Sequence, residues 1–383
     1  MERLIYLNCI SALKARIDSR KGLVQVLLGP RQVGKTTSIL KLIEDYYPKQ
    51  ALYVSADQVF HADREWLQFN WQKAQEERKI LFIDEIQKSY NWSETIKSLY
   101  DASKRAKKPV QCVLLGSSSL QIQKGLSESL TGRFQLTNVY HWNYKESNEG
   151  YKLTFEEYLK FGGYPGSYQF INSSDWVSYV RNSIIATVIE KDILQYHTVK
   201  NPALFRQAFE ILISYPAQEI SYTKLLGQLQ DRGNVELIKY YLSLYEGAFL
   251  IKTLDKYSNK SFKIKSSSPK ILPMAPCLPY LSILDKYSTE ETGRALELMV
   301  GTQLVRLDEA LYYWREEDKE VDFVLKIGRN LYAIEVKSGR YKNSKGLEAF
   351  RKKFPNTKGL IITPENYLNF EASPKAFIEQ YAL

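Results

Sequence analysis

The sequence of 383 residues predicts an α/β protein of two or three domains, because a chain of this length exceeds one ordinary hydrophobic core. Three observations support this fold class. Short apolar runs alternate with helical patterns over about the first 140 residues, which is typical of a parallel sheet covered by helices. A glycine-rich loop follows the first of these runs. Near the C-terminus, strand patterns that carry carboxylates precede a further helical pattern at 346–354.

The first apolar run, 23–28, is expected to be a buried strand that leads into a phosphate-binding loop, with a helical pattern after it. The loop consists of Gly29, Pro30, Arg31, Gln32, Val33, Gly34, Lys35, Thr36 and Thr37. Its glycines let backbone N–H groups face phosphates, and Lys35 would reach the β- and γ-phosphates. The Thr36 hydroxyl is a ligand for Mg²⁺, with Thr37 near the α-phosphate. The loop therefore predicts ATP and Mg²⁺ as ligands.

Two further apolar runs end in polar residues that complete this predicted site. The run 80–83 ends in Asp84 and Glu85, at the strand end where open α/β sheets bind ligands. Asp84 would hold Mg²⁺ through water, and Glu85 would polarise the attacking water. An acidic turn after a core strand is the weaker alternative. The run 112–115 leads to Ser117, which either senses the γ-phosphate or belongs to an ordinary serine-rich turn.

Five segments carry a more specific signal, in the order GPRQVGKTT (29–37), FIDEIQK (82–88), LLGSSSL (114–120), SLTGRF (129–134) and YLKFGGYP (158–165). They resemble a prokaryotic AAA+-like P-loop ATPase family whose members end in a domain called DUF4143. The resemblance implies that Arg133 is an arginine finger or a sensor, which would neutralise charge on the transferring phosphoryl group. The alternative is a surface arginine that closes a turn. An arginine finger acting in trans would require a homo-oligomer.

The middle of the chain predicts two modules after an ATPase core of residues 1–150. By resemblance, residues 151–202 form a helical lid. Residues 203–268 predict a winged helix-turn-helix, with helices at 205–214, 220–229 and 235–245 and a hairpin rich in lysine and serine. Such a module places its third helix in the major groove of DNA, although protein interaction is an equal alternative.

The last module, residues 269–383, begins near a Ser-Pro-Lys segment at 268–270 that the family shares. After it the family has an acidic residue followed by Gly-Leu, whereas this chain has Met-Ala-Pro-Cys-Leu at 274–278. Downstream, Glu297 falls on an expected helix, Asp322 on a strand, and Glu335 and Lys337 on the next strand. Side chains alternate along a strand, so Glu335 and Lys337 share a face that Asp322 can meet.

These four residues resemble the core of the PD-(D/E)XK nucleases, the fold that the DUF4143 resemblance also implies. Asp322 and Glu335 would hold Mg²⁺, with Mn²⁺ as a substitute, and Lys337 would orient the attacking water. Glu297 would complete the catalytic set. The fold class is therefore an α/β protein with an AAA+-like parallel-sheet domain, a helical lid, a winged-helix module and a C-terminal restriction-endonuclease-like α/β domain.

The composition of the chain indicates which kinds of binding partner and cellular location to expect. The net charge of +10 favours a polyanion, and DNA is the usual one. The three scattered cysteines are typical of the cytoplasm, and no apolar run reaches the length that a membrane helix needs. Together these features predict an ATP-hydrolysing, DNA-binding protein with a Mg²⁺-dependent nuclease domain, acting in repair, recombination or defence. The alternative is a nucleotide-dependent switch that binds DNA or a protein partner and has a catalytically silent nuclease fold.

Overall fold

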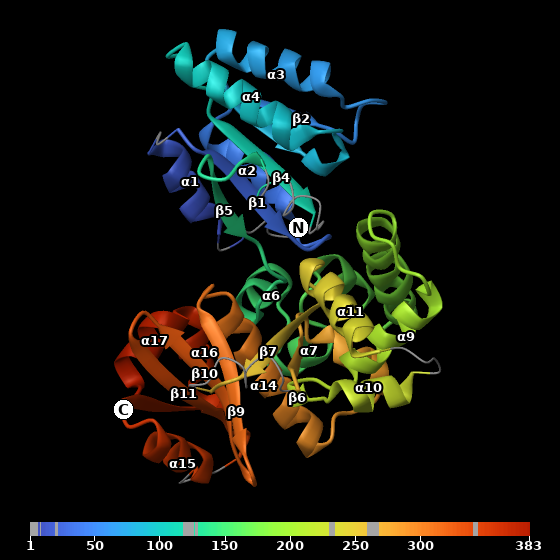
Figure 1. Cartoon of the computed structure of the whole chain (residues 1–383), viewed down its shortest axis with the longest axis vertical. Helices are drawn as coiled ribbons and strands as arrows, with labels where there is room; N and C mark the ends of the chain where they lie inside the picture. The colour runs from blue at the N-terminus through green and yellow to red at the C-terminus, as the bar shows by residue number, and fades with distance from the viewer. Residues whose placement is uncertain are drawn as a thin grey trace. The chain divides into compact units, whose positions relative to one another are not determined.

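The computed structural model describes residues 7, 9–19, 22–117, 126, 129–229, 234–258, 268–339 and 344–383. The chain divides into two compact units (Figure 1). The N-terminal unit comprises Met1–His141, Asn172–Thr198 and Gly247–Phe249, and the C-terminal unit comprises Trp142–Ile171, Val199–Glu246 and Leu250–Leu383.

The N-terminal unit is built on a five-stranded parallel sheet, which confirms the α/β class and the parallel sheet predicted for this part of the chain. Its strands are β1 (Val24–Gly29), β2 (Ala51–Ser55), β3 (Ile80–Asp84), β4 (Cys112–Ser117) and β5 (Phe134–Asn138). Their order across the sheet is β2-β3-β4-β1-β5. The strand that ends in Ser117 therefore lies between the strand that leads into the phosphate-binding loop and the strand that ends in Asp84.

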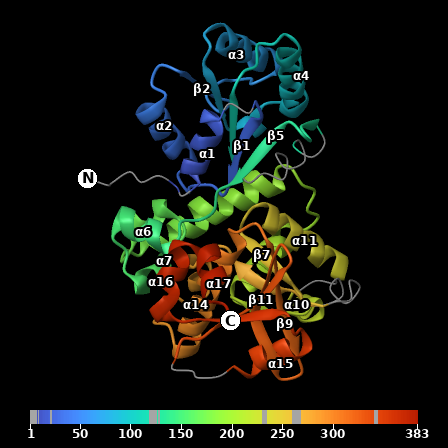
Figure 2. The same cartoon turned by 90° about the vertical axis from the view of Figure 1, so that its left-hand side faces the viewer.

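Helices cover this sheet, and the central strands are buried along their whole length. The helices are α1 (Ile10–Asp18), α2 (Lys35–Tyr46), α3 (Arg64–Glu76) and α4 (Trp92–Arg105). Figures 1 and 2 show α3 and α4 side by side. Trp71 of α3 and Trp92 of α4 share a core with Val26 of β1. Burial on both faces explains why these strands are continuous apolar runs rather than alternating ones.

The segment 172–198 belongs to the N-terminal unit and is helical. It contains α8 (Asp175–Ser178) and two π-helical stretches, η3 (Tyr179–Ile185) and η4 (Val188–Leu194). Its apolar stripe is buried, as the sequence pattern indicates. The lid predicted at 151–202 is thus divided, because residues 142–171 belong to the C-terminal unit. Stretches of π-helix occur frequently at functional sites.

The C-terminal unit contains a seven-stranded sheet in the order β12-β11-β10-β9-β7-β8-β6. Its strands are β6 (Gln218–Glu219), β7 (Ile251–Lys256), β8 (Lys270–Pro273), β9 (Ala310–Glu316), β10 (Lys319–Ile327), β11 (Asn330–Val336) and β12 (Thr357–Ile362). The strands predicted as a wing, β7 and β8, belong to this sheet, since β7 pairs in parallel with β9. The modules predicted at 203–268 and 269–383 therefore share one sheet. The predicted lysine- and serine-rich tip, 259–267, lies outside the described residues.

Several helices of this unit correspond to predicted ones. Three of them, α9 (Pro202–Ile213), α10 (Tyr222–Gln228) and α11 (Val235–Gly247), correspond to the three predicted at 205–245, and residues 230–233 between the second and the third lie outside the described residues. The others are α6 (Tyr144–Tyr151), α7 (Phe155–Phe161), α13 (Cys277–Ile283), α14 (Thr289–Val305), α15 (Lys345–Lys353), α16 (Pro364–Ala372) and α17 (Pro374–Tyr381). From α14 onward the order is helix, three antiparallel strands, helix and a strand, β12, parallel to β11.

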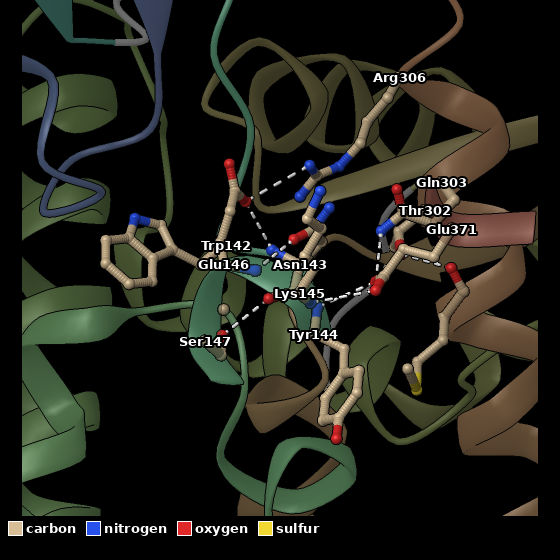
Figure 3. Close-up of polar contacts among 12 residues, drawn as sticks. Trp142, Asn143, Tyr144, Lys145, Glu146, Ser147, Thr302, Gln303, Arg306 and Glu371 are labelled. Carbon is tan, nitrogen blue, oxygen red and sulfur yellow. Dashed lines mark hydrogen bonds and ion pairs between the residues drawn. The ribbon is translucent and has the colours of Figure 1, made fainter. Parts of the chain in front are cut away.

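The N-terminus of α6 is fastened within the C-terminal unit, which explains why the units divide at residue 141 rather than at 150. The carboxylate of Glu371 on α16 accepts hydrogen bonds from the backbone N–H groups of Tyr144 (2.9 Å) and Lys145 (3.0 Å) (Figure 3). Arg306 lies 3.6 Å from Glu146 of the same helix. The first N–H groups of a helix have no partner within it, and they favour a negative charge.

Replacing Glu371 by alanine should therefore lower the free energy of unfolding by about 2 kcal/mol or more, because buried N–H groups lose their acceptor. Urea denaturation followed by tryptophan fluorescence and circular dichroism measures this change. Glu379→Ala is the matched control, since Glu379 is exposed on α17. Equal stability of the two variants would contradict the role given to Glu371.

Candidate functional site

The phosphate-binding loop joins β1 to α2, and two glycines are required by its backbone. Gly34 has a φ of 84°, in the left-handed region that favours glycine, at the position just before α2. A Cβ on Gly29 would lie 2.4 Å from the backbone oxygen of Val139. Lys35 is buried, and its Nζ donates to the backbone oxygens of Gly29 (2.8 Å) and Pro30 (2.5 Å). The lysine head group thus lies within the curve of its own loop.

The residues predicted to hold Mg²⁺, Thr36 and Asp84, lie together at the carboxyl end of the sheet. Asp84 Oδ2 accepts hydrogen bonds from Thr36 Oγ1 (2.7 Å) and from the hydroxyl of Tyr53 (2.8 Å), and Oδ1 accepts from the backbone N–H of Glu85 (2.8 Å). A hydroxyl beside a carboxylate is an oxygen donor set that suits Mg²⁺. Tyr53 was not predicted, because a tyrosine within a strand is indistinguishable from a core residue.

Glu85 and Ser117 are joined by a residue that the sequence did not single out. Gln87 donates through Nε2 to Glu85 Oε2 (2.5 Å) and to Ser117 Oγ (2.9 Å). Glu85 adopts a left-handed backbone conformation with a φ of 52°, which is uncommon outside glycine and occurs often at active sites. The carboxylate predicted to polarise water is thus turned toward the end of β4.

A second unpredicted residue, Asp192 of η4, binds the phosphate-binding loop. Arg31 donates from Nε to Asp192 Oδ2 (2.6 Å) and from Nη2 to Asp192 Oδ1 (2.7 Å). Burial would lower the pKa of the Arg31 guanidinium, but the hydrogen bonds and charge of Asp192 raise that pKa overall. Ser117 Oγ also lies 3.4 Å from Asp192 Oδ1. The next loop residue, Gln32, accepts a hydrogen bond from the hydroxyl of Tyr179 (3.2 Å), so two loop positions contact the segment 172–198.

Burial lowers the pKa of the Lys35 ammonium to about 8, although the charges of Glu85 and Asp84 oppose this shift. A phosphate beside Lys35 favours the charged form and should raise this pKa again. Nucleotide binding at pH 8 should therefore take up about half a proton, since Lys35 is then half protonated without ligand. Titration calorimetry of ADP in buffers of different ionisation enthalpy measures the uptake. Identical heats in all buffers at pH 8 would rule it out.

Arg133 lies near the amino-terminal ends of the parallel strands, whereas the loop lies at their carboxyl-terminal ends. Its backbone oxygen accepts a hydrogen bond from Val24 (2.9 Å), the first residue of β1, whereas Gly29 is the last. Five residues of strand separate these ends by about 16 Å. The Arg133 side chain donates to both carboxylate oxygens of Asp101 (2.9 and 3.1 Å). Arg133 therefore does not reach the phosphate site of its own chain, and only its role in trans remains a hypothesis.

The structure also gathers the four predicted residues of the C-terminal module. Lys337 Nζ lies 2.6 Å from Glu335 Oε2, and Ser344 Oγ donates to Glu335 Oε1 (2.5 Å). Asp322 Oδ2 accepts from the backbone N–H of Val336 (2.8 Å). An irregular register between β9 and β10 at 321–324 surrounds Asp322, and such bulges re-aim side chains.

Lys270, at the start of β8, supplies the cation for the remaining carboxylates. It is 6% exposed, forms an ion pair with Glu297 Oε1, and its Nζ lies 3.9 Å from Asp322 Oδ1. Burial raises the pKa of Glu297 to about 7, against the charge of Lys270. Within the described ranges, no three His, Cys, Asp or Glu residues are grouped as ligands for a metal ion. The Lys270 ammonium lies between Glu297 and Asp322, so the space that these two carboxylates face does not fit a divalent cation, and the other predicted metal ligand, Glu335, is paired with Lys337.

Three protein-family models match the chain, one after another. Residues 21–148 match AAA_14, described as an AAA domain, and residues 292–374 match DUF4143, a domain of unknown function. Residues 152–275 match DUF8612, another domain of unknown function. Across the part of the chain that the structure covers, no helix is both long and apolar enough to cross a bilayer.

The chain is similar to two uncharacterized proteins over most of its length. It is 26% identical to MJ1544 of Methanocaldococcus jannaschii, over 88% of this chain and 80% of that protein. It is 27% identical to Rv2008c of Mycobacterium tuberculosis, over 85% of this chain and 73% of that protein. Among solved structures, AMPPCP-bound DnaA from Aquifex aeolicus matches with a TM-score of 0.32 at 13% identity, covering 64% of this chain and 89% of that one. The RuvB branch migration motor of Thermotoga maritima matches with a TM-score of 0.31 at 15% identity, covering 63% and 86%.

Proposed function

The chain carries an AAA-type P-loop domain followed by a DUF4143 domain, and we propose that the first of these hydrolyses ATP. One observation carries this proposal: the ends of three adjacent strands bring a phosphate-binding loop, a hydroxyl–carboxylate pair and a second carboxylate together. The loop follows β1, Ser117 ends β4, and Asp84 and Glu85 end β3. Lys35 and the loop amides are suited to hold the phosphates.

In the proposed reaction, a water oxygen bonds to the γ-phosphorus as the bond from that phosphorus to the β–γ bridging oxygen breaks. Glu85 accepts the proton of the water, ADP leaves with the electron pair of the broken bond, and inorganic phosphate is released. Thr36 and Asp84 would hold Mg²⁺, which when bound neutralises charge on the phosphates. Gln87 keeps the Glu85 carboxylate oriented through its 2.5 Å hydrogen bond.

We propose further that the protein is a nucleotide-dependent switch that binds DNA without cutting it. The net charge of +10 and the exposed cations Lys345, Arg351 and Lys352 on α15 support a polyanionic partner. Lys270 favours this silent form over the Mg²⁺-dependent nuclease, because its ammonium lies 3.9 Å from the predicted metal ligand Asp322 and pairs with the predicted catalytic Glu297. A cytoplasmic location, where ATP is available, is part of the same proposal.

Both parts are tested in one set of reactions. ATP hydrolysis is measured with and without duplex, single-stranded and branched DNA, in Mg²⁺ and in Mn²⁺, and strand breakage is measured in the same tubes. We expect hydrolysis, salt-sensitive DNA binding and intact strands. Cleavage that Asp322→Ala and Lys337→Ala abolish would establish the nuclease instead. Hydrolysis without any DNA binding would point to a protein partner of the switch.

The position of Lys270 leads to a separate prediction for the C-terminal module. Lys270→Met should create a Mn²⁺ site that depends on Glu297, because removing the ammonium leaves two carboxylates facing one space. Mn²⁺ binding is followed by electron paramagnetic resonance without nucleotide, in Lys270→Met and in Lys270→Met combined with Glu297→Gln. Lys270→Arg, which keeps the positive charge, is the matched control. A Mn²⁺ site in the unmodified protein that Glu297→Gln removes would contradict the argument.

A further inference from the structure

Phosphoryl transfer needs a cation that neutralises charge developing on the γ-phosphate, beyond what the loop lysine supplies. Arg133, the residue that the resemblance suggests, lies at the amino-terminal ends of the strands, away from the loop, and is paired with Asp101. Another arginine is part of the phosphate-binding loop itself. Arg31 is half-buried, whereas the Asp192 that holds it is 2% exposed.

We propose that Arg31, positioned by Asp192, is the arginine that stabilises the transferring phosphoryl group in its own chain. This inference rests on the proposed ATPase activity and deepens it. It assigns a catalytic role to Arg31 and a positioning role to Asp192, a carboxylate of η4.

A chain of hydrogen bonds places Arg31 in the same space as the water-polarising carboxylate. It runs from Arg31 to Asp192 (2.6 and 2.7 Å), from Asp192 to Ser117 (3.4 Å), and from Ser117 through Gln87 (2.9 Å) to Glu85 (2.5 Å). The charge of Glu85 also contributes to the raised pKa of Arg31, so the guanidinium lies within electrostatic range of this carboxylate.

The pairing with Asp192 orients the guanidinium and engages only part of its N–H donors. Both Asp192 oxygens are engaged in a bidentate contact, which fixes the plane of the guanidinium. An arginine has five N–H donors, and this contact uses two of them. A cavity of about 920 Å³ beside the loop is lined by Arg31, Gln87 and Asp192, so the guanidinium borders open space. A γ-phosphate in the loop would meet donors that are already aimed.

The decisive comparison is between two arginines that each donate two hydrogen bonds to a carboxylate, Arg31 and Arg294. We expect Arg31→Ala to lower kcat for ATP hydrolysis by about 100-fold or more, with a much smaller change in KM. Arg294→Ala, which removes two hydrogen bonds to Glu290 on α14, should keep the rate of the unmodified protein. Asp192→Asn should lower kcat less than Arg31→Ala, and adding it to Arg31→Ala should cause no further loss, because both act through one contact.

A binding measurement separates a catalytic role from a structural one. The complex of ADP with aluminium fluoride resembles the transferring phosphoryl group, and such analogues bind tightly only to an intact catalytic set. Arg31→Ala should bind ADP like the unmodified protein but should not retain the aluminium fluoride complex. Mixing Arg31→Ala with Glu85→Gln tests the assignment to one chain, since a residue that acts across subunits would restore activity in the mixture.

Loss of Arg31 alone leaves a buried Asp192 without its cation and can unfold the protein. The double variant Arg31→Gln with Asp192→Asn replaces the ion pair by two neutral amides and is expected to fold, bind ADP and remain inactive. Thermal unfolding and ADP titration check the first two properties. Full hydrolysis by this variant or by folded Arg31→Ala, with Glu85→Gln inactive, would overturn the role of Arg31 while the ATPase proposal stands. Absence of hydrolysis by the unmodified protein would overturn the ATPase proposal itself. Restored activity in the mixture would replace the assignment to one chain by one across subunits.

Discussion

Replacing Glu85 by glutamine should lower kcat for ATP hydrolysis by about 100-fold or more, because the carboxylate that takes the proton of the attacking water is lost. ATP binding should be retained, since Glu85 does not belong to the loop that holds the phosphates. The amide is nearly isosteric with the carboxylate, and it can still accept a hydrogen bond from Gln87. Steady-state phosphate release and equilibrium binding of a fluorescent ATP analogue measure the two quantities separately.

A matched control is Glu44→Gln, which makes the same chemical change on the exposed face of α2. Gln87→Ala is informative beside it, because it leaves Glu85 charged but removes the 2.5 Å hydrogen bond that orients it. We expect an intermediate loss of kcat in Gln87→Ala. An unchanged rate in Glu85→Gln would show that another group accepts the proton.

The sequence was sufficient to predict most of the phosphate site, for a local physical reason. A buried apolar run dictates a strand, and the motif at its end dictates how the chain turns, so the loop, Asp84 and Ser117 could be placed at one edge of the sheet. The partners of these residues could not be placed. Gln87 is one polar residue among several after the strand, and Asp192 lies 161 positions from Arg31 within an apolar helical stripe. A contact between such distant positions leaves no periodic signal.

Contacts between distant positions also explain why the division of the chain into two units could not be predicted. Helix α6 begins within the core predicted at 1–150, but the buried acceptor Glu371, 227 positions away from Tyr144, assigns it to the C-terminal unit. Likewise, the apolar pattern of β7 predicts a strand without indicating its neighbour. Its parallel pairing with β9 turns an expected wing into part of a larger sheet. Local propensity determines which elements form, whereas distant polar contacts determine which unit they join.

In the C-terminal module, alternation along β11 predicted that Glu335 and Lys337 would share a face, and they form an ion pair. Lys270 had no assigned role, because it lies on β8 and meets Glu297 of helix α14 only in the folded chain. Its position changes the expected chemistry. Two carboxylates that face one space attract a divalent cation. Here the ammonium of Lys270 lies between Glu297 and Asp322 and supplies the positive charge instead.

Replacing Asp84 by asparagine should remove the dependence of nucleotide affinity on Mg²⁺ and lower hydrolysis by about 100-fold or more, because a charged oxygen donor becomes a neutral one. In the structure Asp84 accepts hydrogen bonds from Thr36 and Tyr53, so its carboxylate is held beside the loop before any metal binds. The affinity for ATP is measured in Mg²⁺ and in EDTA, and hydrolysis is measured across a Mg²⁺ titration.

Tyr53→Phe is the companion variant, since it removes only the 2.8 Å hydrogen bond from the Tyr53 hydroxyl and keeps the ring. We expect it to retain hydrolysis at saturating Mg²⁺ and to change only the Mg²⁺ concentration at which the rate is half maximal. The reason is that the hydroxyl competes with the metal for Asp84 Oδ2 rather than taking part in bond breaking. If Asp84→Asn responded to Mg²⁺ like the unmodified protein, the metal would have to be held by other groups, and the pairing of Thr36 with Asp84 would be only a structural contact at the strand end.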